Sequence, residues 1–490
     1  MAEMKNTSLA ERDQLNRLLK FLETEATIGP GNDPKRRTSF PMFGRRSMAN
    51  ATQMDMAPKR SLANGSPLDY VPSIVSPPLT NHRMHTVYVD GWSPVAVKRG
   101  DTILFPSGPR KSANTLGGVP ICLETAIDLR KIVYGTPIHS FSREWRKSTF
   151  EFMCIDGQFP YGIQTLRCGA RGLALCVQAY MLKQLIFDRE YKSSALLGSG
   201  ALCPNEFERR RALIGAICEI LWQAGEKKRC CVCLKEQEAC FGPDYRYKMD
   251  GITEKLQLFE FKRYEDLQNF VKRNLEQFQS DSGNGCILFL YSLVLSRTIQ
   301  KVKDDLQEDH DSKLKLLTDM EDADQSLINL ALTGRATPHM HNGDLLYDSK
   351  GQLLPKPVHG IKSRSQAGFL FWDKGEDPEK RTEVGSMLKT PKNPIWVTKV
   401  NGLWGLVFSL NPDLVSDWRV ENRFTMWYYT GLVTQVKPTL LSIETRIGRP
   451  RPKTGLARKE AENKIPPLEQ CIMTKWYGAD IKWNGTLPFI

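Results

Sequence analysis

Apolar residues recur at helical spacing in several parts of this chain. From Leu173 to Leu185 they repeat about every four residues, directly after a glycine-bearing turn, which predicts a helix. Similar patterns predict helices at 120–134, 204–224 and 264–278. The longest apolar run, 286–295, is too short to cross a membrane and predicts a buried helix.

Apolar and β-branched runs predict strands at 229–234 and 255–262, and more densely after residue 385. The later strands are expected at 395–400, 403–408, 424–429 and 439–443. Asn401-Gly402 separates two of these runs and is a favoured two-residue hairpin turn. Helices early in the chain and strands late in it favour an α+β architecture.

The first 114 residues have a different pattern. Residues 1–28 predict one amphipathic helix, because Ser8 and Glu11 form a capping-box pattern at its start. This helix is expected either to dock on its own domain or to bind a protein partner. Residues 29–114 are rich in proline, serine and basic residues and predict a largely disordered linker. Residues 115–490 predict one domain, in which 446–464 form a basic, flexible loop.

Composition narrows the class of protein. The 490 residues are 41% hydrophobic and 25% charged, as in globular proteins. Twelve cysteines without a signal peptide favour free thiols in a reducing compartment, the cytoplasm or the nucleus, and no membrane association is expected. The net charge of +13 leaves open binding to nucleic acid or an acidic partner, but no nucleic-acid-binding motif accompanies it.

The turn before the 173–185 helix is the place where a cysteine protease positions its nucleophile. Backbone N–H groups and the helix dipole at such an N-terminus lower the pKa of a thiol. In this chain Arg171 occupies that place. Arginine stays protonated and cannot attack a carbonyl, so the scaffold is that of an enzyme but the residue is not.

The same stretch resembles the MINDY deubiquitinases, cysteine peptidases with a papain-like fold variant that cut lysine-48-linked polyubiquitin. The resemblance is to the branch of the third and fourth paralogues, and most to the fourth. It covers roughly 120–490 and includes Tyr161-Gly162-Ile163, Leu173-Ala174, Val177-Gln178-Ala179, Tyr247 to Gly251, Pro394 to Val397 and Tyr428 to Leu432.

This resemblance implies where each catalytic group would stand. The nucleophile falls on Arg171, the oxyanion-hole glutamine on Thr165 (with Gln164 one position away), and the catalytic histidine on Leu403. No histidine follows His359, so the base cannot come from the last part of the chain. The resemblance therefore implies an inactive deubiquitinase-like protein, a pseudoenzyme, that binds ubiquitin or lysine-48-linked polyubiquitin.

Two alternatives keep some chemistry in the chain. A rewired deubiquitinase would use Cys168 as nucleophile and a base such as His139, whereas Cys176 is expected in the core. A metal site would draw on Cys230, Cys231, Cys233 and Cys240, or on His339 and His341. Neighbours on a strand point to opposite faces, so structural cysteines are the preferred interpretation, and we expect no metal and no cofactor.

Overall fold

The computed structural model describes residues 117–188, 199–306, 315–347, 350–377, 381–446 and 464–488. All of them belong to one compact unit, Leu104–Ile490. The predicted helix at 1–28, the linker at 29–114 and residues 447–463 of the predicted basic loop lie outside the described residues.

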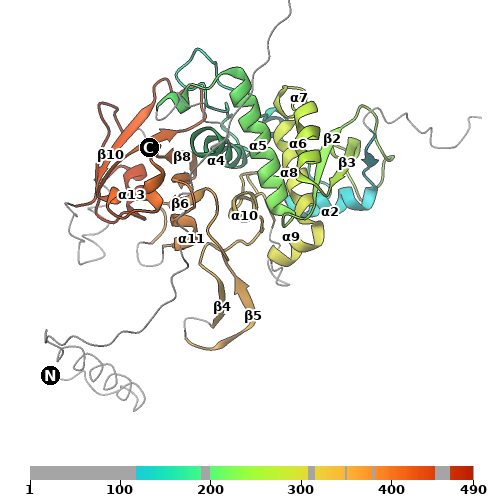
Figure 1. The fold of residues 1–490 in the computed structure, drawn as a ribbon. Helices are drawn as coiled ribbons and strands as arrows, with labels where there is room; N and C mark the ends of the chain where they lie inside the picture. Colours follow the sequence, from blue (N-terminus) through green and yellow to red (C-terminus); the bar gives the residue numbers. More distant parts are fainter. Residues whose placement is uncertain are drawn as a thin grey trace, which may run out of the picture. The chain divides into compact units, whose positions relative to one another are not determined.

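A six-stranded sheet forms one end of this unit (Figure 1). Neighbouring strands follow one another along the chain, and all pairs are antiparallel except the parallel pair β6–β7. In spatial order the strands are β11 (Asp480–Lys482), β10 (Thr439–Glu444), β9 (Arg423–Tyr429), β8 (Leu403–Phe408), β7 (Ile395–Val400) and β6 (Gly368–Trp372).

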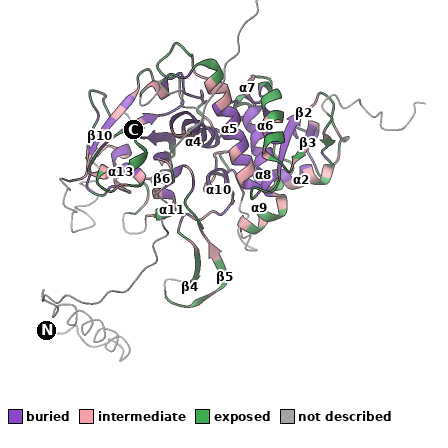
Figure 2. Ribbon diagram, viewed as in Figure 1, coloured by how far each residue is buried: buried purple, intermediate pink, exposed green. Residues whose placement is uncertain are grey.

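Two smaller sheets complete the strands of the described residues. An antiparallel sheet at the other end of the unit has the order β1 (Val119–Pro120), β3 (Leu256–Phe261), β2 (Cys230–Lys235). A largely exposed hairpin, β4 (Asp344–Tyr347) and β5 (Leu353–His359), projects from the unit (Figures 1 and 2).

Helices fill the space between the two larger sheets. Helix α4 packs against the six-stranded sheet, α5 packs against α4, and α8 packs between α5 and strand β2 of the smaller sheet (Figure 1). The α-helices are α2 (Leu123–Tyr134), α3 (Arg143–Lys147), α4 (Arg171–Phe187), α5 (Glu206–Ala224), α6 (Tyr264–Arg273), α7 (Glu276–Gln279), α8 (Gly285–Arg297), α9 (Ile299–Leu306), α10 (Gln325–Thr333), α11 (Ser386–Lys389) and α13 (Pro467–Met473). The short 3₁₀ helices are η2 (Ser199–Leu202), η3 (Thr253–Lys255), η4 (Pro412–Val415) and η5 (Val420–Asn422).

The α+β class and most predicted elements are confirmed, but the helix predicted at 264–278 is two helices, α6 and α7. The break falls at Asn274, whose side-chain amide donates a 2.9 Å hydrogen bond to the Phe270 carbonyl and so caps α6. Beyond the break, the Phe278 carbonyl accepts the Phe150 N–H at 2.9 Å. The side-chain cap and this hydrogen bond to a distant segment together override the amphipathic pattern.

The six-stranded sheet is covered on both faces. Strand β7 shows why, because its side chains alternate: Ile395 and Val397 join the core around α4, whereas Trp396 joins a second core with α13. Helix α4 itself is buried almost all round (Figure 2). It is therefore the central helix of the unit, held between the six-stranded sheet and helix α5.

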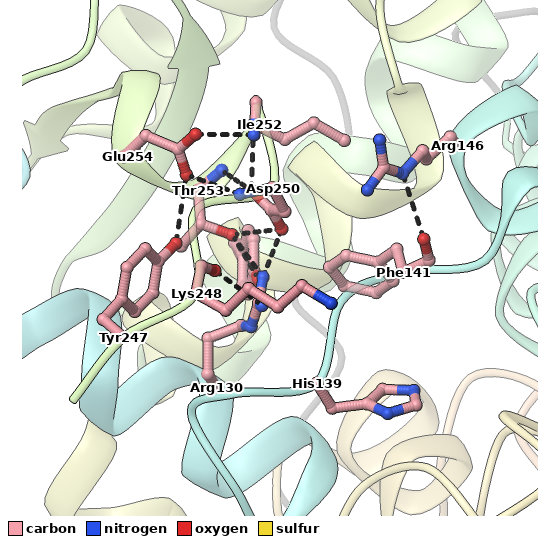
Figure 3. A network of polar contacts seen from close by, with 12 residues as sticks. Arg130, His139, Phe141, Arg146, Tyr247, Lys248, Asp250, Ile252, Thr253 and Glu254 are labelled. Carbon is pink, nitrogen blue, oxygen red and sulfur yellow. Dashed lines mark hydrogen bonds and ion pairs between the residues drawn. The ribbon is translucent and has the colours of Figure 1, made fainter. Parts of the chain in front are cut away.

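A buried ion pair ties α2 to the segment that leads into β3 (Figure 3). Arg130 is fully buried; its Nη1 contacts the Asp250 carboxylate and its Nη2 donates to the Lys248 carbonyl at 3.3 Å. Asp250 also accepts the N–H groups of Ile252 and Thr253 at 2.9 and 2.8 Å. Burial alone would raise the pKa of the Asp250 carboxyl, but Arg130 and these donors hold it below its ordinary value.

We expect Asp250→Asn to lower the free energy of unfolding by about 3–5 kcal/mol, because the substitution leaves Arg130 charged, buried and unpaired. Urea titration at pH 7 measures the loss. Since the folded-state pKa of Asp250 is depressed, the wild-type advantage should shrink as the pH falls below about 4. The control is Arg263→Gln in an exposed ion pair with Glu265, which should cost less than about 1 kcal/mol.

Candidate functional site

The residues that carry the family resemblance around α4 bind one another. Gln178, fully buried on α4, donates from Nε2 to the Tyr161 carbonyl at 3.0 Å and accepts the Ile163 N–H. The Tyr429 hydroxyl, on β9, donates to the Ile163 carbonyl at 2.8 Å. The segment before the turn is thereby anchored to both α4 and the sheet, which fixes where the turn begins.

The turn itself fits closely against a neighbouring loop. A Cβ atom on Gly169 would lie 1.7 Å from the Glu321 carbonyl oxygen, so only glycine fits there. The Gly169 carbonyl accepts the Ala323 N–H at 3.2 Å. Two residues after Gly169 the chain enters α4, whose first residue is Arg171.

The start of α4 meets β8 without a side chain between them. A Cβ atom on Gly172 would lie 2.9 Å from the Trp404 ring, so the helix backbone rests directly on the indole. Trp404 is buried, and Lys399 Nζ lies 4.8 Å from its ring centroid. This contact sets the distance between the first turn of α4 and the beginning of β8.

A cavity of about 540 Å³ opens at this junction. Arg171 and Leu403, the positions that the resemblance implies for nucleophile and base, both line it, together with Cys168. The remaining lining residues come mainly from the turn before α4, the start of β8 and the connection after β9: Arg167, Asp322, Gly402, Trp404, Tyr428, Thr430, Leu432, Thr434, Gln435, Val436, Lys437, Thr439 and Thr486.

Arg171 is only 7% exposed. Its Nε and Nη2 both donate to the Thr430 carbonyl oxygen, at 3.1 and 2.7 Å, which links α4 to the end of β9. Burial and the neighbouring cation Arg167 lower the pKa of the guanidinium, but arginine remains protonated at neutral pH. The side chain is therefore a fixed positive charge with no capacity for nucleophilic attack.

The other two implied positions lie in different surroundings. Leu403 is the first residue of β8, directly after the Asn401-Gly402 turn, and is 51% exposed. Thr165 lines a second cavity of about 350 Å³ that also contacts Arg171 and Gln164. Its N–H donates to the Gly431 carbonyl at 2.7 Å, and its buried hydroxyl has no hydrogen-bond partner among the described residues. Arg171 and Leu403 thus line the same cavity, whereas Thr165 lines a second one that Arg171 also borders.

Cys168, the alternative nucleophile, is poorly prepared for attack. Its Sγ lies 3.2 Å from the Ser148 hydroxyl, and burial raises the pKa of the thiol although this hydrogen bond opposes the shift. No histidine lines the cavity. His139, the base named with Cys168, instead has its Nε2 2.8 Å from a Glu321 carboxylate oxygen. Cys176 is fully buried in α4.

The sequence left open whether cysteine or histidine side chains gather into a metal site, and the described part of the chain contains no such cluster. No group of three or more histidine, cysteine, aspartate or glutamate side chains there could hold a metal ion. Cys231 and Cys233 are buried in β2, and their N–H groups donate to Ser296 and Ser292 of α8. All twelve cysteines are described and free of disulfides.

A helix that spans a membrane must be long and largely apolar. Within the described ranges, no single helix is long and apolar enough to cross a bilayer. Helices α8 and α9 satisfy that test only when joined, and they meet at an angle of 84°.

Sequence reasoning did not anticipate four residues that shape the cavity. Thr430, which accepts the Arg171 hydrogen bonds, lies in a segment already noted for its resemblance, and Trp404 directly follows Leu403. Arg167 lies within the spacer before α4, so counting from Arg171 could have found it. Lys437 carries no signal in the sequence, because only the path of the chain after β9 brings it to the cavity.

One conserved protein domain matches most of the chain. The conserved domain described as "Deubiquitinating enzyme MINDY-3/4, conserved domain" matches residues 130–485. The chain therefore belongs to the MINDY-3/4 family of deubiquitinating enzymes, as the resemblance predicted.

Individual relatives give the same result. The chain is 34% identical over 390 residues to "Probable ubiquitin carboxyl-terminal hydrolase MINDY-4" of Mus musculus, covering 80% of this chain and 50% of that protein. The chain is 35% identical over 388 residues to the MINDY-4 protein of Xenopus tropicalis, which covers 79% of this chain and 49% of that protein. "Ubiquitin carboxyl-terminal hydrolase MINDY-3" of Bos taurus is 31% identical over 244 residues, 45% and 51% of the two chains.

The matches to MINDY-4 proteins are thus longer than those to MINDY-3, in agreement with the predicted branch. The chain spans about half the length of the curated relatives it matches. No solved structure matches it.

We expect iodoacetamide at pH 7 to alkylate Cys122 at least about tenfold faster than Cys168, because alkylation requires the thiolate. Cys122 is exposed and a hydrogen bond from Thr125 lowers the pKa of its thiol, whereas burial raises that of Cys168. Peptide mass spectrometry after timed quenching measures both rates, and the exposed Cys203 controls for access. Preferential labelling of Cys168 would restore it as a candidate nucleophile.

Proposed function

We propose that this protein is a catalytically inactive member of its family, a deubiquitinase-like pseudoenzyme on a papain-like fold variant. In this proposal it binds ubiquitin or lysine-48-linked polyubiquitin and acts through that interaction. The observation that carries the proposal is the cavity at the start of α4, which is lined by Arg171 and Leu403 and by no histidine.

The chemistry of isopeptide hydrolysis supports this proposal. A cysteine peptidase needs a thiolate and a base that can move a proton, and loss of either costs several orders of magnitude in rate. Arg171 can supply neither group, and the Leu403 side chain has no proton to accept or donate. Thr165 offers a hydroxyl in place of an amide, and its cavity is separate from the one lined by Leu403.

A rewired peptidase based on Cys168 is the runner-up and is less well supported. The thiol would have to ionise against its raised pKa, and the hydroxyl of Ser148, which lies 3.2 Å from its Sγ, cannot act as a base at neutral pH. His139 faces Glu321 and does not line the cavity. Nucleic-acid binding also lacks support, because the cations at this site lie in a recess with an apolar wall and form no stripe.

Retained binding is supported by the state of the scaffold. The glycine-bearing turn, the close contact of α4 with β8 and the cavity are all present, although Arg171 and Leu403 stand at the positions implied for the catalytic groups. Apolar side chains remain open to solvent around the cavity: Leu403 is 51% exposed and Val436 is 73% exposed. Exposed apolar residues beside a recess are typical of a protein-binding surface.

Other parts of the proposal rest on sequence alone. The helix that the sequence predicts at 1–28 would supply a further site for a protein partner, and the 115–490 domain would carry ubiquitin binding. A reducing compartment, the cytoplasm or nucleus, fits twelve free thiols.

We expect the purified protein to leave lysine-48-linked tetra-ubiquitin uncleaved over hours, because no histidine lines the cavity and burial raises the pKa of the Cys168 thiol that does. Gel analysis of wild type beside Cys168→Ala measures this, and the two proteins should be indistinguishable. Cleavage by wild type that disappears in Cys168→Ala would overturn the proposal and establish the rewired peptidase.

We expect the full chain to bind tetra-ubiquitin with a Kd in the micromolar range, which calorimetric titration measures. The matched control is Leu403→Asp, which places a charge among the exposed apolar residues of the cavity and should weaken binding about tenfold. Absence of association at several hundred micromolar would contradict the proposed partner and leave the loss of catalysis unaffected.

A further inference from the structure

The cavity at the start of α4 has an unbalanced charge. Arg167, Arg171 and Lys437 line it, against one carboxylate, Asp322. Arg167 and Lys437 are exposed, and neither forms an ion pair within the described residues. Three cations that converge on one recess create a positive potential there, which attracts an anion.

Arg171 is the buried member of this set and the one built into the wall. More than nine-tenths of its surface is buried, and its Nε and Nη2 donate to a neutral carbonyl, that of Thr430. Its Nη1 has no hydrogen-bond partner among the residues the structure describes, and the charged side chain that acts on it most is another cation, Arg167. A buried charge without a counter-ion is costly, so an arriving anion would gain the full benefit of neutralising it.

The helix reinforces this preference. Arg171 is the first residue of the 17-residue helix α4, whose N-terminal N–H groups and dipole place further positive charge at the same end. A cation is normally disfavoured at such a position. An anion bound in the cavity would satisfy the guanidinium and the helix end together.

The rest of the lining limits the kind of anion. Leu403, Trp404, Leu432 and Val436 form an apolar wall beside the cations. A carboxylate that ends an apolar or glycine-rich segment matches both parts, because its charge meets Arg171 while its chain lies along the wall. The planar guanidinium fork suits the two oxygens of a carboxylate.

We propose that this cavity is a receptor for a free chain-terminal carboxylate, and that the ligand is the C-terminal carboxylate of unconjugated ubiquitin. The identity of the ligand rests on the proposed function. The site prefers a free C-terminus to an isopeptide bond, because an amide is neutral and cannot neutralise Arg171. Position 171, which the resemblance assigns to the nucleophile that attacks the isopeptide bond, would in this chain bind the free C-terminus instead.

The experiment compares two forms of ubiquitin against the full chain by calorimetric titration: ubiquitin with its free C-terminal carboxylate and the same protein with a C-terminal amide. We expect the free acid to bind about tenfold more tightly. Arg171→Gln should abolish this preference. Lys228→Gln removes one exposed positive charge that does not line the cavity, and should retain it.

A second variant guards against misfolding of Arg171→Gln, which loses both hydrogen bonds to Thr430. The double variant Arg167→Gln/Lys437→Gln changes only exposed side chains, so its fold should be intact. We expect its preference for the free acid to fall about threefold or more, and the wild-type preference to fall as salt is raised. An unchanged preference in both variants would overturn the assignment to this cavity.

A short probe separates this inference from the proposed partner. Acetyl-Leu-Gly-Gly is titrated as the free acid and as the amide. If ubiquitin acid and amide bind equally well, the carboxylate receptor is overturned and ubiquitin binding stands. If only the peptide acid binds, and Arg171→Gln abolishes that binding, the receptor is supported and ubiquitin is the wrong partner. If neither ubiquitin nor peptide binds, both proposals are overturned.

Discussion

The close packing of the first turn of α4 on Trp404 is the constraint on which the rest of this architecture depends. Gly172 lets the helix backbone rest on the indole ring, and a single methyl group there would already collide with it. Because α4 is buried on nearly every side, this contact fixes the six-stranded sheet relative to the helical layer. The cavity exists because two elements far apart in sequence meet at this fixed distance.

Polar groups inside this packed region are held in place by local networks. Gln178 satisfies the backbone of the segment before the turn, and Asp250 with its surrounding donors neutralises Arg130 on the other side of the molecule. Arg171 differs from both, since within the described residues its side chain donates only to the neutral Thr430 carbonyl. Arg130 thus has a counter-ion, whereas Arg171 has only a neutral carbonyl, and this difference marks the cavity as a place where a bound anion would be stabilised.

Much of this fold could be predicted where local chemistry decides the conformation. Strands β7 and β8 have the predicted bounds, and Asn401 and Gly402 between them have φ values of 49° and 75°, as the hairpin turn requires. Helix α5 begins two residues later than predicted because Asn205 and Glu208 form a capping box. The helix predicted at 264–278 divides because the Asn274 side chain caps its first part and the Phe150 N–H bonds to the Phe278 carbonyl in its second part. The apolar periodicity reveals neither interaction.

The candidate site was predictable in part for the same reason. Counting along the chain placed Arg171 and Leu403, and both line one cavity. Their surroundings depend on tertiary packing: Lys437 arrives from the connection after β9, and Thr165 turns toward a second cavity because its N–H is committed to Gly431. Residue spacing could locate Arg171 and Leu403 in the sequence. Which charged side chains surround them could be seen only in the folded chain.

The bond between Arg171 and Thr430 has an evolutionary consequence. A cysteine at position 171 could not reach as guanidinium does, so the Thr430 carbonyl would lose both of its donors, at a cost of about 1–3 kcal/mol. A lineage that regained the thiol would meet this loss before any histidine at 403 could make the thiol useful. Under the proposed loss of catalysis, a return to hydrolysis would therefore require several coordinated changes, because Arg171 now holds the end of β9 as well as the nucleophile position.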